Sequence, residues 1–422
     1  MEISSTKDKK QTAYQDTPIG KIPADWEVKR LGEIIKGKGE YGINAPAVPY
    51  DKNLPKYIRI TDIDDEGNFS TEKITSVICE TASDYSLKEG DILFVRTGAT
   101  TGKAYLYKKD DGELVFAGFL IRFKIDDKIA DKYFVWSYTK TTKYENWVRK
   151  VSQRSGQPGL NSNEYSSLLL PLPPLPEQQR IAEVLSTWDQ AIQCTEQLIL
   201  QKEQRKKWLM QKLLTGKIRL KGFSGEWKEM KIGDTGIIPQ KTAITKIENH
   251  KLLTVRLHTK GIEFNERDKP ILSKTGRPYY ERYKGEILIG RQNIHNGGIG
   301  LITEEFDGHI CSNAITSFIV TRNCTTEYLL YYLQYPRYYQ MIENYMGGTG
   351  QKELSEKQFL EIPIRLPNTI EEQTAIAEVL QTADKEIELL KAKAEKLKEQ
   401  KKGLMQQLLT GRMRLNLITI NK

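Results

Sequence analysis

Apolar residues in two long stretches of the chain recur at alternating intervals of four and three residues. This spacing is typical of the seam of a coiled coil, where one stripe of a helix packs against a partner helix. The pattern predicts two helices of about 35 residues each. The first seam comprises Ile181, Leu185, Trp188, Ile192, Thr195, Ile199, Lys202, Lys206, Leu209 and Leu213, and the second comprises Ile376, Leu380, Ala383, Ile387, Leu390, Ala394, Leu397, Lys401, Leu404 and Leu408.

Both predicted helices carry start and stop signals. Pro176 suits the first turn of the earlier helix, and residues 369–372 (TIEE) read as a capping box at the start of the later one. Gly216 and Gly411 follow the last seam residues, as glycines commonly do at helix C-termini.

The chain contains an internal duplication. Residues 177–220 and 372–415 align without a gap at an offset of 195 residues, and about half of the aligned positions are identical. The same offset places residues 90–96 (GDILFVR) on residues 285–291 (GEILIGR). Each half therefore consists of a domain of about 150 residues followed by a long helix. Because the domains share only a skeleton while the helices are similar, we expect two related but different recognition surfaces.

The helices raise three questions about what they contact. We expect them to pack antiparallel within one chain, across a pseudo-two-fold axis; the alternative is pairing with a second copy. A basic run along the first helix is either a solvated face or a DNA contact, and comprises Lys202, Arg205, Lys206, Lys207 and Lys212. Apolar residues near the helix ends are either additional core or a docking face for partner helices, and comprise Leu209, Met210, Leu213, Leu404, Met405 and Leu408.

The two domains have the pattern of a mixed α/β (α+β) fold. Short runs rich in β-branched residues, at 56–61, 91–95 and 120–125, are bounded by Gly, Asp and Asn. A helical stretch follows at 132–150 in the first domain, and 326–345 takes its place in the second.

A polar loop leaves a strand with an arginine in both domains. Such a loop can approach a phosphate backbone with its N–H groups and offer side chains to base edges. An ordinary hairpin turn with a structural arginine is the alternative. The candidates are Arg96, Thr97, Thr100 and Lys103 in the first domain, and Arg291, Gln292, Asn293 and His295 in the second.

Further candidates for DNA contacts lie outside these loops. Arg59 and Arg256 occupy corresponding strand positions, where a structural ion pair is the alternative, and His258 follows the second of them. Glycine-containing turns near residues 156 and 350 are weaker candidates for phosphate contacts, through Arg154, Gln157, Gln351 and Lys352.

Composition narrows the class of partner. The formal net charge of +9 and the pI of about 9.0 favour a polyanion. The four cysteines form no C-x-x-C pair, which indicates a reducing cytoplasm, and neither a signal peptide nor a membrane-spanning run is evident.

Residues 98–103 (GATTGK) are one residue too short for a phosphate loop, and Ala104 stands where Ser or Thr is needed. The histidines and cysteines lack metal-ligand spacing. We therefore expect no catalysis, metal or cofactor in this chain.

The chain resembles the specificity subunit of type I restriction–modification enzymes. The resemblance rests on residues 171–182 (PLPPLPEQQRIA), on residues 90–103 (GDILFVRTGATTGK), on LLTG at both helix ends, and on the order domain, helix, domain, helix. It implies target-recognition domains at 1–175 and 217–370 and spacer helices at 176–216 and 371–415. It also implies a bipartite DNA target, two methyltransferase subunits and restriction subunits as partners, with S-adenosylmethionine, ATP and Mg²⁺ on those partners.

The helix length agrees with a spacer role. At about 1.5 Å per residue each helix is about 50 Å long, which corresponds to about 15 base pairs of B-DNA. A methylation-only or fused restriction system is an alternative, and a coiled-coil protein adaptor is another.

Overall fold

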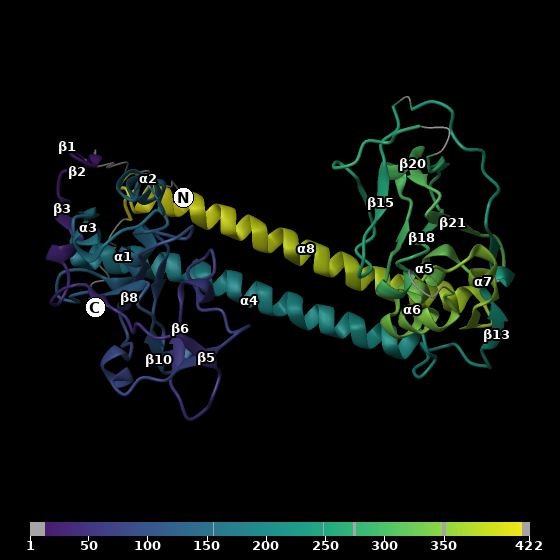
Figure 1. The fold of residues 1–422 in the computed structure, drawn as a ribbon, viewed down its shortest axis with the longest axis horizontal. Coiled ribbons are helices and arrows are strands. Elements are labelled where there is room, and N and C mark those ends of the chain that lie inside the picture. The colour runs from purple at the N-terminus through teal and green to yellow at the C-terminus, as the bar shows by residue number, and fades with distance from the viewer. Residues whose placement is uncertain (1–12, 155, 248, 273–275, 348–351, 416–422) are drawn as a thin grey trace, which may run out of the picture. The chain divides into compact units, whose positions relative to one another are not determined.

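The computed structural model describes residues 13–154, 156–247, 249–272, 276–347 and 352–415. The chain forms two compact units, one comprising Met1–Cys194 with Lys393–Lys422 and the other Thr195–Ala392. Each unit contains one α/β domain together with part of each long helix (Figure 1). The expected alternation of domains and helices is confirmed.

The first unit is built on two four-stranded sheets. One is antiparallel and has the order β4-β11-β8-β9, and the other has the order β10-β6-β7-β5 with β10 parallel to β6. Two-stranded ribbons join β1 to β2 and β12 to β3. The strands are β1 (Tyr14–Thr17), β2 (Gly20–Pro23), β3 (Glu27–Arg30), β4 (Glu40–Tyr41), β5 (Ala47–Pro49), β6 (Lys56–Ile58), β7 (Thr75–Val77), β8 (Asp91–Val95), β9 (Ala104–Leu106), β10 (Leu114–Phe116), β11 (Leu120–Lys124) and β12 (Leu169–Leu172).

The helical stretch predicted at 132–150 is two helices. Helix α1 (Lys132–Tyr138) ends before Thr141, whose hydroxyl accepts a hydrogen bond from the Tyr144 N–H and so caps α2 (Thr142–Val151). A threonine cap satisfies a free N–H group at the start of a new helix and so separates the two. A short helix, α3 (Ser162–Ser166), and the 3₁₀ turns η1 (Leu31–Glu33), η2 (Ile60–Asp62), η3 (Ala82–Tyr85) and η4 (Lys109–Asp111) complete the domain.

The second unit repeats the antiparallel sheet in the order β14-β21-β18-β19. Its ribbons pair β13 with β22, β15 with β16 and β17 with β20. The strands are β13 (Lys228–Lys231), β14 (Gly236–Ile237), β15 (Leu253–Val255), β16 (Ile262–Phe264), β17 (Tyr279–Arg282), β18 (Ile287–Gly290), β19 (Ile299–Leu301), β20 (His309–Ser312), β21 (Ile315–Val320) and β22 (Pro363–Leu366).

The stretch predicted as helical at 326–345 is also divided. Pro336 is at the first turn of α6 (Pro336–Ile342), directly after α5 (Thr326–Gln334). Proline has no N–H and cannot continue the preceding helix, but it suits the start of a new one. The remaining elements are α7 (Glu356–Glu361) and the 3₁₀ turns η5 (Ile232–Asp234), η6 (Ile294–Asn296), η7 (Glu304–Phe306) and η8 (Glu343–Tyr345).

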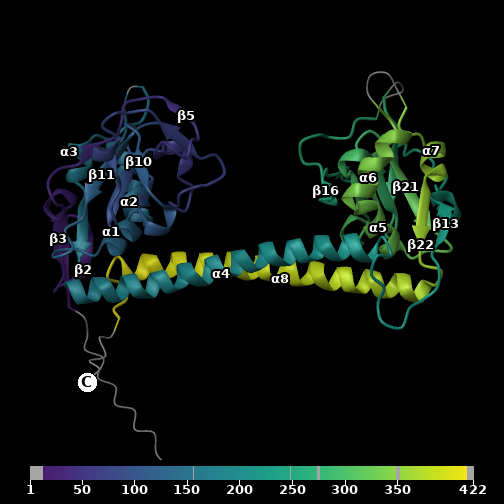
Figure 2. The ribbon, with the colours of Figure 1, turned by 90° about the horizontal axis from the view of Figure 1, so that it is seen from below.

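The two predicted coiled-coil helices are α4 (Leu175–Leu213) and α8 (Ile370–Leu408), of 39 residues each. They run side by side in both views (Figures 1 and 2). Buried residues of α4 and α8 belong to the cores of both domains. The core of the first unit includes Ile181, Leu185, Met405 and Leu408, and the core of the second includes Met210, Leu213, Ile376 and Leu380.

Ion pairs show that the helices are antiparallel within the chain. In the first unit Lys401, on α8, pairs with Asp189, on α4, which also accepts a hydrogen bond from the Tyr133 hydroxyl. In the second unit Lys206, on α4, pairs with Asp384, on α8, which accepts from the Tyr331 hydroxyl at 2.7 Å. The two pairs are related by the offset of 195 residues.

The basic run on α4 is partly an interhelical contact. Besides Lys206, Lys202 lies 2.5 Å from Glu386, so two cations of the run are engaged with α8. Arg205 and Lys207 are exposed, which agrees with the solvated-face interpretation for them.

The helix-end residues proposed as a partner interface are largely core. Met210, Leu213, Met405 and Leu408 are buried in the domain cores, and Leu209 and Leu404 are half-buried against them. Burial leaves the first four no surface for a partner, so the core alternative describes them. The large apolar residues of these helices that are exposed are instead Leu198, Leu200, Trp208, Ile370 and Leu389. Among the described residues, none of the helices combines the length and the apolar character that a bilayer requires.

The same arginine contact joins the segment after a long helix to the start of the other helix in both units. Arg414 contacts Glu177 at 2.6 Å and Asp25 at 2.8 Å, and its guanidinium lies 5.8 Å from the Trp26 ring. In the second unit Arg219 contacts Glu372 at 2.5 Å and lies 5.8 Å from the Trp227 ring. Glu177 and Glu372 are each 2% exposed, so the same buried carboxylate with an arginine partner occurs at corresponding places in the two units.

Candidate nucleic-acid interface

The first candidate loop, residues 96–103, is a closed turn at the end of β8. The Val95 N–H donates to the Lys103 carbonyl at 2.9 Å, and the Gly102 N–H donates back to the Val95 carbonyl at 3.1 Å. Within the loop, Gly98 has φ of +92°, a conformation that side chains other than glycine's rarely adopt. The Thr101 hydroxyl donates to the Gly98 carbonyl at 2.7 Å, which further restrains the turn. The loop is therefore preorganised by its own backbone.

Arg96 is held at the base of this loop by its backbone. Its N–H donates to the Phe119 carbonyl at 3.0 Å, and its carbonyl accepts from the Leu160 N–H at 2.7 Å. Its guanidinium lies 4.9 Å from the centre of the Tyr41 ring, and the side chain is half-buried. A guanidinium against an aromatic face is oriented as well as charged. Arg96 is thus positioned to present its donors in a fixed direction.

The structure brings the turn near Gly156 to the Arg96 loop. Thr97 forms a backbone bridge with Gly159, and the Gly98 N–H donates to the Pro158 carbonyl at 3.1 Å. A Cβ placed on Gly98 would lie 3.5 Å from Nε2 of Gln157, which shows that the amide of Gln157 is beside the loop. Thr97, Thr100, Lys103 and Gln157 therefore form one surface with Arg96.

The second candidate loop, residues 291–298, repeats the two backbone hydrogen bonds that hold Arg96. We call this pair of hydrogen bonds at the arginine the backbone frame. The Arg291 N–H donates to the Ala314 carbonyl at 3.1 Å, and its carbonyl accepts from the Leu354 N–H at 3.1 Å. These are the counterparts of the Phe119 and Leu160 bonds of Arg96. Gln292 is half-buried and Asn293 is exposed directly after the arginine. The frame is common to both domains, while the side chains that follow it differ.

His258 lies against the second loop. It is in the hairpin between β15 and β16, where its N–H donates to the Asn296 carbonyl at 2.8 Å and the Thr259 N–H donates to the Gly297 carbonyl at 2.9 Å. Both His258 and Thr259 have positive φ, at 58° and 56°. Non-glycine residues in this region are strained and are found more often at functional sites than elsewhere. His258 and the Arg291 loop thus form one surface.

Two buried nitrogens of the Arg291 loop have no hydrogen-bond partner among the described residues, Nε of Arg291 and Nδ1 of His295. Nε2 of His295 contacts the Asn296 side chain at 2.9 Å. Buried polar groups are normally satisfied, so two such atoms in one loop are exceptional. Both nitrogens keep a hydrogen-bonding capacity that no described residue uses.

Most candidate cations are paired with a carboxylate of their own domain. Exposed pairs of this kind add little to stability because solvent screens the two charges, so a phosphate can replace the carboxylate at small cost. A hydrogen bond from Lys103 lowers the pKa of Asp65, and one from Lys352 lowers the pKa of Glu343. The pairs are Lys103 with Asp65, Arg154 with Glu164, Arg256 with Glu263, Arg291 with Glu353 and Lys352 with Glu343.

Arg59 differs from the other candidates. It follows β6 rather than lying at a strand centre, and its guanidinium contacts both carboxylate oxygens of Asp62 at 2.9 and 2.8 Å. Asp62 is buried, so this bidentate pair holds the turn η2 together. The ion-pair alternative describes Arg59. Gln351 lies outside the described residues.

Two residues of the first surface have no signal in the sequence, Tyr41 and Phe119. Tyr41 is a partner of the Arg96 side chain and Phe119 of its backbone, and both side chains are exposed. Phe119 is identified by the hydrogen bond between its carbonyl and the Arg96 N–H, and a contact of this kind is not visible in the sequence.

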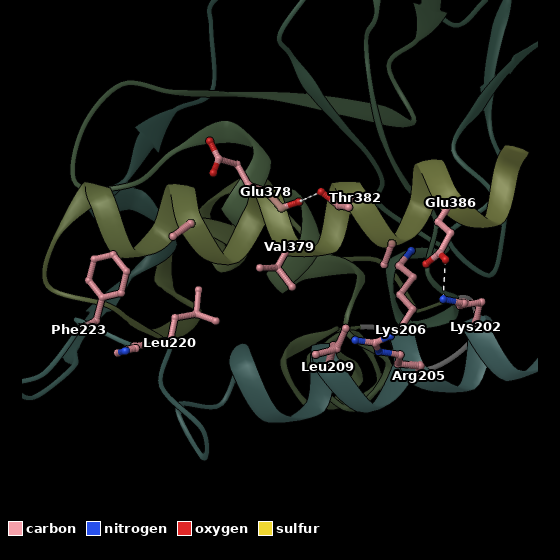
Figure 3. A pocket seen from close by; sticks show the side chains of 13 residues that line it. Lys202, Arg205, Lys206, Leu209, Leu220, Phe223, Glu378, Val379, Thr382 and Glu386 are labelled. Carbon is pink, nitrogen blue, oxygen red and sulfur yellow. Dashed lines mark hydrogen bonds and ion pairs between the residues drawn. The ribbon is translucent and has the colours of Figure 1, made fainter.

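A groove of about 520 Å³ lies on the helix pair of the second unit. Figure 3 shows Lys202 reaching Glu386 on one side, with Leu209, Leu220 and Val379 lining it. The groove has apolar walls and charges of both signs. Among the described residues, no cluster of three His, Cys, Asp or Glu side chains could hold a metal ion.

Two α/β domains carry corresponding arginine loops, and each forms a unit with its own part of the antiparallel helix pair. The chain matches the family described as "Type I restriction modification DNA specificity domain" over residues 23–204 and again over residues 224–399, and it belongs to this family. The resemblance inferred from the sequence is thereby confirmed.

Two relatives align with this chain over nearly their whole length. The chain is 27% identical to the "Type I restriction enzyme MjaVIII specificity subunit" of Methanocaldococcus jannaschii, with 94% of each chain covered. It is also 27% identical to that organism's "Putative type I restriction enzyme MjaX specificity subunit", with 96% of this chain and 98% of the relative covered.

Solved structures share the fold. The S subunit of a type I restriction–modification system from M. genitalium is 14% identical, with a TM-score of 0.57 over 91% of this chain and 96% of that one. The HsdS subunit of Thermoanaerobacter tengcongensis is 18% identical, with a TM-score of 0.50 over 93% of this chain and 98% of that one.

Proposed function

We propose that the two domains of this specificity subunit each read one half of a bipartite DNA target, through the surface around the arginine loop. The observation that carries the proposal is the duplicated backbone frame of Arg96 and Arg291. Two domains that read different DNA sequences need the same backbone support for the loop and different side chains on it.

The side chains suit hydrogen-bonding readout. Arginine can form two hydrogen bonds to guanine, and glutamine or asparagine can form two to adenine, in the major groove. The paired lysines and arginines around the loops suit phosphate contacts, which position a protein on DNA without reading sequence. The net charge of +9 supports a polyanionic partner. Arg256, Lys352, Arg154 and Lys103 are the phosphate contacts that we propose on this basis, and we add His258 because it lies against the Arg291 loop.

The partners that we propose are two methyltransferase subunits and the restriction subunits of a type I complex. They would supply S-adenosylmethionine, ATP and Mg²⁺. On docking, these partners would cover exposed apolar side chains of the helix pair such as Trp208, Leu200 and Leu389. A complex that only methylates its target is the second candidate, and the same surfaces would serve it.

Gln292→Ala and Asn293→Ala are expected to relax specificity in one half-site only. Each removes a side chain competent to read a base edge, at a cost of about 1–3 kcal/mol for the correct base. The measurement is methylation mapping, with binding to matched and singly mismatched duplexes, for the subunit assembled with its methyltransferase.

The matched control is Gln340→Ala, an exposed glutamine on α6. It should leave both half-sites unchanged. Equal loss of affinity for all sequences in the Gln292 and Asn293 variants would mean that the loop contacts the backbone and not the bases.

The purified chain alone is expected to show no methyl transfer, nucleolysis or ATP hydrolysis, because the sequence contains no motif for any of these reactions. Assays with labelled S-adenosylmethionine, supercoiled plasmid and ATP test each one. Activity that persists in preparations shown by mass spectrometry to lack partner subunits would contradict this expectation.

A further inference from the structure

The turn of residues 117–120 presents an exposed phenyl ring beside the Arg96 loop. The Leu120 N–H donates to the Ala117 carbonyl at 2.9 Å, and the Gly118 N–H donates to the Ile43 carbonyl at 2.7 Å. The Arg96 N–H donates to the Phe119 carbonyl at 3.0 Å. Three backbone hydrogen bonds therefore fix this turn.

The residues around Phe119 are buried while Phe119 is not. Ala117 is 6% exposed and Leu120 is fully buried, whereas Phe119 is 57% exposed. The flanking core residues prevent the turn from rotating the phenyl ring inward. A single exposed apolar residue is unremarkable by itself, but this one is bonded through its backbone to the proposed reading arginine.

The second domain has the same turn with a smaller side chain. Ala314 accepts the hydrogen bond from the Arg291 N–H that corresponds to the bond between Arg96 and Phe119. The position thus belongs to the duplicated frame, and its side chain varies between phenylalanine and alanine. Variation at a fixed place beside the arginine is the property expected of a residue that determines specificity.

We propose that Phe119 is a specificity-determining residue that contacts the C5 methyl group of a thymine in the half-site read by the first domain. The inference rests on the proposed DNA contact of the Arg96 loop. In the major groove, thymine differs from the other bases by this methyl group, and apolar side chains read it by contact. Hydrogen-bonding neighbours read polar edges, so an apolar reader adds information that they cannot supply.

The test replaces thymine by uracil, which removes only the methyl group. Duplexes carrying the methylated motif of the complex are made with single uracils at each thymine of the first half-site. Wild-type complex is expected to bind one of them about four-fold more weakly, the effect of one methyl group leaving its apolar contact. In Phe119→Ala the difference between thymine and uracil should vanish, and in Phe119→Leu it should be retained.

Controls separate this proposal from the function on which it rests. Ile78→Ala, at another exposed apolar residue, should retain the difference between thymine and uracil. If Arg96→Ala loses the first half-site while Phe119→Ala discriminates thymine from uracil as well as wild type does, the Phe119 proposal fails and the proposed function stands. If neither variant changes readout of that half-site, the proposed function fails for this domain. A half-site without thymine, or equal weakening on all duplexes in Phe119→Ala, also overturns the inference.

Discussion

Replacing residues 221–369 with the corresponding domain of a related specificity subunit is expected to change one half of the methylated motif completely and to leave the other half unchanged. Each domain carries its own arginine frame, and the proposed base readers of the second frame all lie within the exchanged segment. The segment ends directly before α8, so both long helices remain intact. Methylation mapping of a host that carries the chimera measures the outcome.

The exchange requires that the new domain fit the retained helices. The Thr325 N–H donates to the Gln373 side chain at 3.0 Å, and the Tyr331 hydroxyl donates to Asp384 at 2.7 Å. The domain taken from the relative should therefore have a tyrosine at the position of Tyr331. The matched control exchanges residues 1–174 instead and should alter only the other half-site. Changes in both half-sites from either exchange would contradict independent reading.

Arg414→Ala and Arg219→Ala are each expected to destabilise the unit in which they lie by about 3–5 kcal/mol, because each leaves a buried carboxylate without its cation. The carboxylates are those of Glu177 and Glu372, both 2% exposed. Arg414 also lowers the pKa of Asp25 by hydrogen bonding, but Asp25 is exposed and adds little. Thermal unfolding measures the loss, and hydrogen exchange of peptides from each half shows which unit is affected.

Neighbouring cations provide matched controls. Arg412 and Lys217 are exposed, lie two residues before Arg414 and Arg219, and correspond to each other in the duplication. Their replacement by alanine should change the free energy of unfolding by no more than about 0.5 kcal/mol. Adding Glu177→Gln to Arg414→Ala should restore part of the stability, because a neutral amide is cheaper to bury than an unpaired charge. Equal losses in the control and test variants would mean that the buried pairs are not the cause.

Repetition explains why much of the architecture could be predicted. A coiled-coil seam is visible at every helical turn, and the duplication shows each element twice. The helices α4 and α8 were therefore predicted together with their antiparallel pairing, and the strands β8 and β11 to within one residue. The helical stretches at 132–150 and 326–345 were predicted as single helices. Each is divided, because a threonine cap and a proline start a new helix inside it.

The candidate surfaces were predicted only in part. Arg96 and Arg291 were found because a strand followed by a polar, glycine-containing loop is a local pattern. The neighbours of these loops come from distant segments, such as Gln157 beside Gly98 and His258 against Asn296. Hydrogen bonds between such segments leave no periodic trace. The same holds for Arg59, where the bidentate contact with Asp62 identifies a structural role.

The sequence by itself determined the duplication, the two seams and the positions of the two arginine loops, since each depends on spacing along the chain. The tertiary structure decided which groups are buried or paired. The seam lysines Lys206 and Lys401 pair with Asp384 and Asp189 of the opposite helix, and the apolar residues at the helix ends belong to the domain cores. It also placed the Phe119 ring in solvent beside Arg96. Burial and ion pairing depend on what the rest of the chain brings to a residue, and no local pattern contains that information.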